Sequence, residues 1–196
     1  MVARSEESRQ AIIDATLTLM GLGDEKPGTT VQRLTIESIA KRAGVSKATI
    51  YRWWPNKVAV VLDAFVSDYL GHTPIDPDLP ADEALAAHVK SVVRQYAGDD
   101  GRIIAQIIAE GQYDKDVLDA FHERFWDDRA RVVLALMQRG VEEGVLRDDL
   151  DLNIAASIIY APIYQRLLLG GGPLDDAFVD DLLALAFRSL RPPTSK

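Results

Sequence analysis

Side chains suited to contact with phosphates and base edges are concentrated between residues 46 and 57. Arginine and lysine donate hydrogen bonds to guanine O6 and N7, and small side chains let a helix approach the bases closely. The N–H groups at the start of a helix bind phosphate oxygens. The side chains that could make such contacts are Lys47, Ala48, Thr49, Tyr51 and Arg52. Helix starts are expected at Thr35, Ser46 and Asn56, and Lys57 places a cation directly after the last of them.

Two short helices joined by a glycine turn are predicted to position these residues. Thr35 is a good N-cap for the first, Gly44 ends it as a residue free to adopt positive φ, and Ser46 caps the second. The second helix must stop before Pro55, and Asn56 is expected to cap the next. Residues 36, 39, 40 and 43 form one apolar stripe. The small core expected to hold the two helices at a steep angle is Ile39, Ala40, Ala43, Val45, Ile50 and Trp54.

A helical wheel predicts which side chains of the second helix face water. Ile50 and Trp54 define its buried face, so Ala48 and Arg52 point away from the core. Thr49 and Tyr51 then lie on the flanks, and Lys47 lies in the first turn. A recognition helix needs such a surface. The alternative is an ordinary helical corner with a solvated basic face.

The run from Ile39 to Lys57 resembles the DNA-binding domain of the TetR repressor family: Ile-Ala, then Ala-Gly-Val-Ser, then a tyrosine, an aromatic and a closing lysine. The resemblance implies that Thr35 and Lys57 bind phosphates and that Tyr51 does so through its hydroxyl. It places Trp53 at the DNA backbone and Trp54 in the core. Ser46, Lys47, Ala48 and Thr49 would lie at or near the bases. One departure is the long stretch 21–34, which we expect to be a local loop; added backbone contacts from Arg33 are the alternative.

The remainder of the chain also has helical periodicity, so we predict an all-α fold of about nine helices. The first helix should start near Ser5, with Glu6 and Glu7 in its first turn. A fourth should follow Asn56, and others are expected at about 81–97, 101–111, 114–140, 151–169 and 174–190. We therefore predict a helix-turn-helix DNA-binding domain at 1–57 and a helical effector-binding and dimerisation domain at 58–196.

The charge is divided along the same boundary. The whole chain carries 22 basic and 30 acidic residues, a net charge of −8. Residues 1–57 hold 9 basic and 6 acidic residues, a net of +3, which leaves 13 and 24, a net of −11, for residues 58–196. Such an asymmetry suggests a basic module attached to an acidic one, although a run of charge is more often a solvated face.

Composition excludes several other classes. The chain has no cysteine, so disulfide scaffolds and thiolate chemistry are excluded. No signal peptide is recognisable, and the apolar run 154–164 is shorter than the roughly 20 residues of a membrane span. We therefore expect a cytoplasmic protein without a membrane association. Asp119 and His122 form a lone metal-ligand pair, and there is no nucleophile elbow or dinucleotide fingerprint. Neither a metal nor a cofactor is therefore expected. Two classes compete with a DNA-binding regulator, namely an enzyme and an architectural or interaction protein.

The resemblance implies partners for the acidic part: a second copy of the chain, a small-molecule effector of unknown identity and, for the whole protein, a double-stranded DNA operator. The function expected is a sequence-specific regulator, in most of the family a repressor that its effector releases from a palindromic operator. The expected dimer interface is Ile158, Pro162, Ile163, Leu167, Phe178, Leu182, Leu185 and Leu190, unless these helices only close the protomer's own core. The expected effector-binding residues are Tyr96, Phe121, His122, Phe125, Trp126, Arg129, Tyr160 and Tyr164, although an aromatic stripe is core more often than ligand site.

Overall fold

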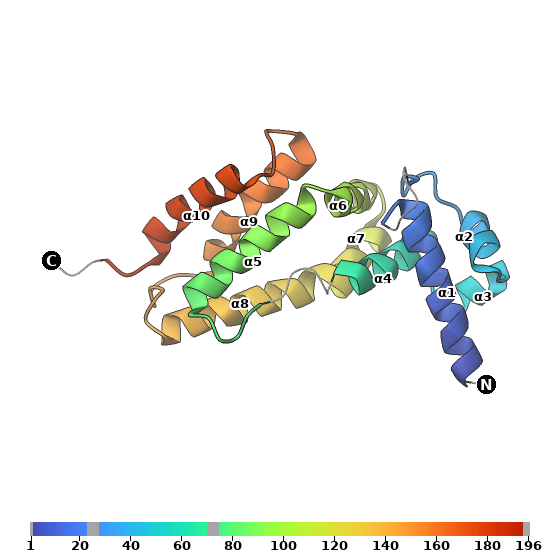
Figure 1. The fold of residues 1–196 in the computed structure, drawn as a ribbon, viewed down its shortest axis with the longest axis horizontal. Coiled ribbons are helices and arrows are strands. Elements are labelled where there is room, and N and C mark those ends of the chain that lie inside the picture. The colour runs from blue at the N-terminus through green and yellow to red at the C-terminus, as the bar shows by residue number, and fades with distance from the viewer. Residues whose placement is uncertain (1, 23–27, 70–74, 194–196) are drawn as a thin grey trace. The chain divides into compact units, whose positions relative to one another are not determined.

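The computed structural model describes residues 2–22, 28–69 and 75–193, and within these ranges all regular structure is helical (Figure 1). The predicted all-α class is confirmed. Because α7, the π-helix η1 and α8 follow one another without a break, the described ranges contain nine helices. The elements are α1 (Val2–Met20), α2 (Ile36–Ala43), α3 (Lys47–Tyr51), α4 (Lys57–Tyr69), α5 (Ala81–Tyr96), α6 (Asp99–Gly111), α7 (Lys115–Phe121), η1 (His122–Trp126), α8 (Asp127–Glu142), α9 (Leu152–Leu169) and α10 (Asp176–Leu190).

The predicted ends of the short helices are confirmed. The Thr35 side chain accepts a hydrogen bond from the Ser38 N–H in a capping box, and Gly44 ends α2 with φ of 69°. The Ser46 side chain caps α3 by accepting from the Thr49 N–H. Asn56 Oδ1 accepts from the Ala59 N–H at 2.9 Å at the start of α4.

Two details of the predicted helices are wrong. The first helix begins at Val2 rather than near Ser5, so Glu6 and Glu7 do not lie in its first turn. The single helix expected at 114–140 contains a π-helical turn over His122–Trp126. A π turn takes up an extra residue and shifts the phase of the side chains that follow it, which a fixed period of 3.6 residues does not anticipate.

The chain forms two compact units. Unit 1 consists of residues 1–70 and 102–126. Within it, α1 packs on α2 and α4, and α4 packs on α7 and η1. The apolar residues of α4 are buried around most of the helix, and the Phe65 ring lies 5.4 Å from the Phe125 ring. Helix α4 is therefore the central helix of unit 1, which also contains α2 and α3.

Unit 2 consists of residues 71–101 and 127–196. Its long helices pack in a ring of neighbours, α5 on α8, α8 on α9, α9 on α10 and α10 on α5, which is a four-helix bundle. Gly170 ends α9 in the left-handed conformation, with φ of 68°, and so the predicted end of this helix at about residue 169 is confirmed.

The two units are divided by packing and not by role. Residues 58–69 and 102–126 pack with the N-terminal segment. The boundary predicted after Lys57 separates a DNA-binding domain from an effector-binding domain. It stays a prediction, because the two units are defined by packing and not by function.

Candidate DNA interface

The exposed face of α3 is the one that the helical wheel predicts. Ile50 and Trp54 are buried, at 0% and 1% exposure. Tyr51 is 55% exposed and Trp53 37%. Thr49 and Lys57 are half-buried, and the other candidates are exposed, namely Thr35, Ser46, Lys47, Ala48 and Arg52. All nine predicted contact residues therefore reach solvent.

The core below this face is slightly smaller than predicted. Ile39 and Ala40 are buried together with Ile50 and Trp54, whereas Ala43 and Val45 are half-buried. Each of these two residues lies beside the Gly44 turn, where the chain reverses at the surface.

Local hydrogen bonds fix the start of α3. Ser46 Oγ accepts from the Thr49 N–H at 3.1 Å, and the hydroxyls of Ser46 and Thr49 lie 2.9 Å apart. The two side chains that the resemblance places near the bases therefore have defined orientations before DNA binds. Each hydroxyl oxygen carries two lone pairs, so the pair retains acceptor capacity toward a base or phosphate.

Lys47 is paired with a carboxylate that sequence reasoning did not consider. Its Nζ donates to Glu37 Oε1 at 2.6 Å, which links α3 to α2 across ten residues. This hydrogen bond raises the pKa of Lys47 and lowers the pKa of Glu37. The pair is exposed, so a phosphate can compete with Glu37 for the ammonium group.

The stretch between α1 and α2 is held as a packed loop over its described parts, residues 21–22 and 28–34. Arg102 Nη2 donates to the Met20 carbonyl at 2.7 Å, and the Val31 N–H donates to Gln106 Oε1 at 2.8 Å. Lys57 Nζ donates to the Gln32 carbonyl at 3.0 Å. A side chain at position 28 would come within 2.2 Å of the Met20 carbonyl, which explains the glycine there.

Trp54 has the core position that the resemblance implies, with a polar partner. Its Nε1 donates to Asp63 Oδ2 at 2.7 Å. Asp63 Oδ1 in turn accepts from Arg124 Nη1 at 2.6 Å. Sequence reasoning missed Asp63, although an acid within the apolar run of residues 58–65 is a signal that could have found it.

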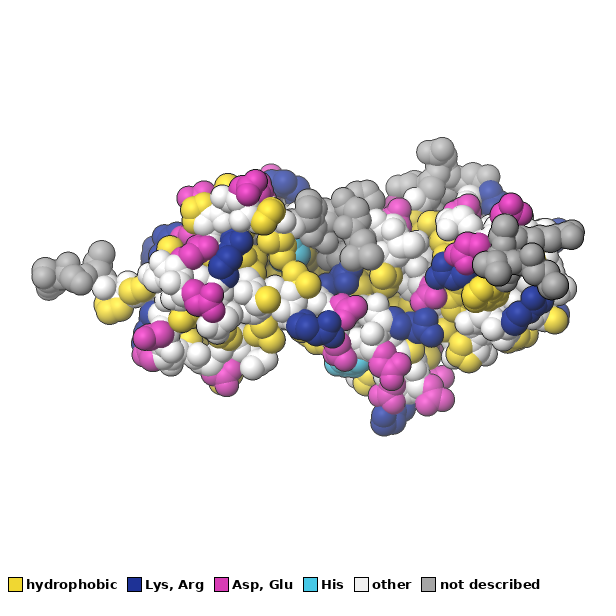
Figure 2. All heavy atoms as spheres, turned by 90° about the horizontal axis from the view of Figure 1, so that it is seen from below, with side chains coloured by type: hydrophobic (Ala, Val, Ile, Leu, Met, Phe, Trp, Pro, Cys, Tyr) yellow, Lys and Arg dark blue, Asp and Glu magenta, His cyan; other side chains and the backbone are white. Residues whose placement is uncertain are grey.

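Basic and acidic side chains are intermixed on the face of the molecule in Figure 2, where Asp and Glu lie beside Lys and Arg. The segment that carries the predicted contact residues has a different charge balance. Residues 31–57 hold six basic residues and one acid, Glu37, a net of +5. The excess of positive charge is therefore local to the segment that carries α2 and α3, while the whole chain has a net negative charge.

The structure distributes the predicted effector-binding residues over both units. Phe121 and Phe125 are buried and contribute to the core of unit 1, with ring centroids 5.4 Å apart. His122 is exposed and Trp126 half-buried in the same unit. In unit 2, Tyr96 and Tyr164 bring their hydroxyls to 2.9 Å, and Arg129 and Tyr160 are half-buried.

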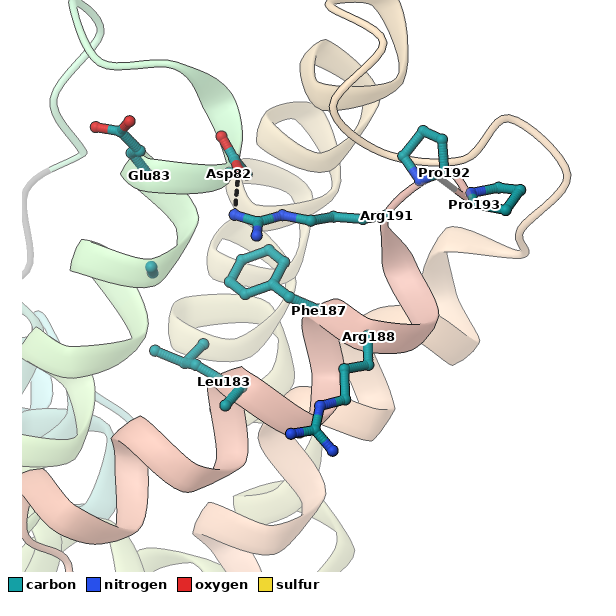
Figure 3. A pocket seen from close by; sticks show the side chains of 10 residues that line it. Asp82, Glu83, Leu183, Phe187, Arg188, Arg191, Pro192 and Pro193 are labelled. Carbon is teal, nitrogen blue, oxygen red and sulfur yellow. Dashed lines mark hydrogen bonds and ion pairs between the residues drawn. The ribbon is translucent and has the colours of Figure 1, made fainter. Parts of the chain in front are cut away.

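A groove of about 540 Å³ lies elsewhere in unit 2, between the first turns of α5 and the end of α10 (Figure 3). Arg191 bridges its two sides by pairing with Asp82 at 2.6 Å, and its guanidinium lies over the Phe187 ring. None of the eight predicted effector-binding residues lines this groove.

The candidate dimer residues differ in their burial. Ile163, Leu182 and Leu190 are buried in the core of unit 2, as the alternative reading of these helices expects. Ile158 and Leu185 are 49% and 66% exposed. Pro162, Leu167 and Phe178 are half-buried. Further large apolar side chains that were not predicted are exposed on α9, namely Ile154, Leu168 and Leu169.

Two further features of the sequence can be placed in the described residues, namely the acidic and histidine side chains and the apolar helix α9. No group of three or more His, Asp or Glu side chains there is arranged to hold a metal ion. Asp119 instead accepts a hydrogen bond from Lys115 at 2.5 Å. By length and composition, α9 is the one helix in the described ranges that would suffice to cross a membrane, and 17% of it is buried.

Comparison with known proteins connects this geometry to a family. Residues 31–64 match the model of the bacterial regulatory proteins of the tetR family, and residues 71–186 match the tetracyclin repressor-like C-terminal domain. The chain is 34% identical over 188 residues to the uncharacterized HTH-type transcriptional regulator YdeS of Bacillus subtilis, covering 96% of this chain and 92% of YdeS. It is 29% identical over 195 residues to the DNA-binding transcriptional repressor TetR of Mycobacteroides abscessus, covering 96% and 98% of the two chains.

The fold is shared along with the sequence. The crystal structure of the TetR family transcription regulator SCO0332 superposes with a TM-score of 0.80 at 26% identity, covering 95% of this chain and all of that one. These relatives are transcriptional regulators and not enzymes. The two family models together extend over α2, α3 and most of the bundle, and the chain therefore belongs to the TetR family of DNA-binding helix-turn-helix transcriptional regulators.

Proposed function

We propose that this regulator is a repressor that binds a palindromic operator as a homodimer and is released from it by a small-molecule effector. The observation that carries the proposal is the exposed face of α3, with its small, hydroxyl and cationic side chains held on a capped helix. A regulator of this kind acts where the chromosome is, in the bacterial cytoplasm. Its similarity to a protein named as a transcriptional repressor supports the negative sign of regulation.

The exposed residues of α2 to α4 are assigned separate roles at the operator. Ser46, Lys47, Ala48 and Thr49 lie at the start of α3 and read bases in the major groove. Arg52 adds a cation to the same face. Thr35, Tyr51 and Lys57 bind phosphates, and Trp53 packs against the sugar–phosphate backbone. These phosphate contacts set the register of α3, and the base contacts provide the sequence preference.

The dimer is formed through the apolar surface of α9 and α10. Ile154, Ile158 and Leu168 lie along one side of α9 at helical spacing, and Leu185 is exposed on α10. Exposed large apolar side chains in such number on two adjacent helices are typical of an interface. Ile158, Pro162, Leu167, Phe178 and Leu185 remain in the proposed interface, whereas the buried Ile163, Leu182 and Leu190 support it from beneath.

The effector is proposed to bind among the helices that follow the DNA-binding segment. The interior of unit 2 offers hydroxyl groups from Tyr96, Tyr160 and Tyr164 and a guanidinium from Arg129. A few polar groups in an apolar and aromatic interior are the usual lining of a small-molecule site. Phe121, His122, Phe125 and Trp126 belong to unit 1, where the two phenylalanines are buried, and they stay separate candidates.

Selection of bound duplexes from a random DNA pool tests the proposal. We expect a palindrome whose half-sites lie one helical turn apart, because a twofold dimer presents two copies of α3. A single unrepeated motif would refute the dimeric mode of binding, and recovery of no motif would refute sequence-specific recognition.

A titration with small molecules that raise the melting temperature of the protein tests the release mechanism. Linkage requires that a releasing molecule weaken operator binding and that saturating operator weaken binding of the molecule by the same factor. A tightly bound molecule whose affinity is unaffected by operator DNA would not be the proposed effector. Loss of reporter expression on deletion of the gene would reverse the proposed sign.

A further inference from the structure

The π-helical turn η1 lies at a distinctive place in the chain. It interrupts the long helix between α7 and α8, and its last residue, Trp126, is the last residue of unit 1. Single π turns within α-helices are rare and are found frequently at functional sites.

Arg124, in the middle of η1, is bonded to the core helix of unit 1. Its Nη1 lies 2.6 Å from Asp63 Oδ1 on α4. The other oxygen of the same carboxylate accepts from Trp54 Nε1 at 2.7 Å. A single carboxylate therefore joins η1 to Trp54, three residues after the end of α3. We call these three side chains the Arg124–Asp63–Trp54 network.

The network fixes the end of α3 through a buried ring. Trp54 is 1% exposed, and its backbone N–H donates to the Ile50 carbonyl at 3.0 Å. A buried indole N–H needs an acceptor, and removal of that acceptor leaves a costly unsatisfied donor. The orientation of Trp54 thus depends on where the Asp63 carboxylate lies, and Ile50 and Trp54 together set the buried face of α3.

The Asp63 carboxylate is held by two cations and is partly buried. The Asp63 side chain is 21% exposed and that of Arg124 37%, so their charge-assisted hydrogen bond is partly shielded from water. Arg9 of α1 adds a second cation, with Nη2 at 3.7 Å from Asp63 Oδ2, and its guanidinium lies 5.8 Å from the Trp54 ring. Arg124 is the one of these cations that comes from outside the first four helices.

We propose that Asp63 and Arg124 are positioning residues for DNA binding, which hold the recognition helix through Trp54 and make its orientation depend on η1. Neither residue needs to touch DNA. The operator affinity then responds to a segment that lies some seventy residues after α3 in the sequence and passes directly into α8.

The first test is Arg124→Gln, measured with the duplex obtained by selection. We expect operator affinity to fall by about threefold to thirtyfold, the range for residues that modulate a site without touching its ligand. The salt dependence of binding should keep its slope, because no phosphate contact is removed. Arg124→Lys, which keeps the charge, should recover part of the loss. Lys115→Gln removes an exposed cation of the neighbouring α7 and should have no effect.

A double-mutant cycle with Asp63→Asn tests whether the two residues act together. We expect Arg124→Gln, Asp63→Asn and the double variant to lose nearly the same affinity, because each breaks the same network. Additive losses would overturn the proposal. A shallower salt slope in Arg124→Gln would also overturn it, because Arg124 would then be a phosphate contact.

The indole N–H signal of Trp54 in ¹H–¹⁵N spectra gives a readout that needs no DNA. It is assigned with Trp54→Phe, and we expect it to shift in Arg124→Gln and to stay near its wild-type position in Arg124→Lys and Lys115→Gln. An unshifted signal in Arg124→Gln would refute the network. If Arg124→Gln does not fold, the other two variants test the network. The Trp54 signal should then shift in Asp63→Asn and stay near its wild-type position in Arg124→Lys. Since this measurement is independent of operator binding, it separates failure of the network from failure of the proposed repressor.

Discussion

Lys57 is the residue at which a structural and a DNA-binding role are most easily separated. One of its three N–H donors is used on the Gln32 carbonyl, which leaves the ammonium group able to bind a phosphate as well. For Lys57→Gln we expect weaker binding to all duplexes alike and a salt slope shallower by about 0.9, the contribution of one phosphate contact. Fluorescence anisotropy at several salt concentrations measures both.

The control for Lys57 is Lys115→Gln, which removes a cation remote in sequence from α2 to α4 and should keep the wild-type slope. If Lys57→Gln weakens binding but leaves the slope unchanged, Lys57 acts only by holding the loop at Gln32.

Glu37 is predicted to restrain DNA binding through its pair with Lys47. Removal of the carboxylate in Glu37→Gln frees the ammonium group and takes a negative charge from the segment, so non-specific affinity should rise, by up to about fivefold for an exposed pair. The hydrogen bond from Lys47 lowers the pKa of Glu37, so the pair is intact above that pKa and is lost as the pH falls through it. The affinity of the wild type should then rise toward that of Glu37→Gln.

The pH dependence can be followed from neutral pH downward into the range below the ordinary pKa of glutamate. An unchanged ratio between wild type and Glu37→Gln across the whole range would contradict the predicted role of Glu37. The Glu37 carboxyl signal should also titrate at higher pH in Lys47→Gln than in the wild type.

At the scale of the element, the turn between α2 and α3 depends on the backbone of one residue. Gly44 has φ of 69° and nothing within 4 Å of the position of a Cβ atom, so Gly44→Ala introduces backbone strain without a clash. We expect the free energy of unfolding to fall by about 1 kcal/mol. Relief of this strain would re-orient α3, and operator affinity should fall more than stability alone explains.

Gly144, after α8, is a matched control for this turn. It has φ of 72° and the same open surroundings, but it belongs to unit 2. Gly144→Ala should cost about the same stability and leave operator affinity unchanged. Equal losses of operator affinity in the two variants would show that the glycine turn has no special role in DNA binding. Chemical denaturation and anisotropy provide the two measurements.

At the scale of the whole molecule, operator binding is predicted to depend on the exposed face of α9. Ile158→Glu places a charge where an apolar contact is proposed, and we expect the dimer to dissociate at least about thirtyfold more readily, as for an interface hot spot. Operator affinity should fall with it, since in the proposed dimer each monomer binds one half-site. Sedimentation equilibrium measures the association directly.

Tyr113→Glu is the control for the dimer, because Tyr113 is 95% exposed and belongs to unit 1, whereas α9 and α10 belong to unit 2. It should leave the association unchanged. A wild-type protein that is monomeric at micromolar concentration, or an Ile158→Glu protein that still dimerises, would contradict the proposed interface.

Much of the molecule follows from local sequence. The caps at Thr35, Ser46 and Asn56 and the stop at Gly44 were predictable, because capping and positive φ depend on residues within one turn of each other. The exposed face of α3 was predictable because a helix repeats every 3.6 residues, so two buried residues fix the direction of the rest. The family pattern between Ile39 and Lys57 has the same local character.

Tertiary structure decided what depends on residues distant in sequence. Helical spacing placed Ile163 and Ile158 alike in the dimer interface, but the neighbouring helices bury the first and leave the second half exposed. The π turn over His122–Trp126 shifts the phase of the residues that follow it, which a fixed period of 3.6 residues does not anticipate. The Asp63 carboxylate acquires Trp54 and Arg124 as partners only when α3, α4 and η1 are packed together. The sequence therefore determined the helices and the exposed surface that is predicted to contact DNA, whereas packing determined which side chains hold that surface in place.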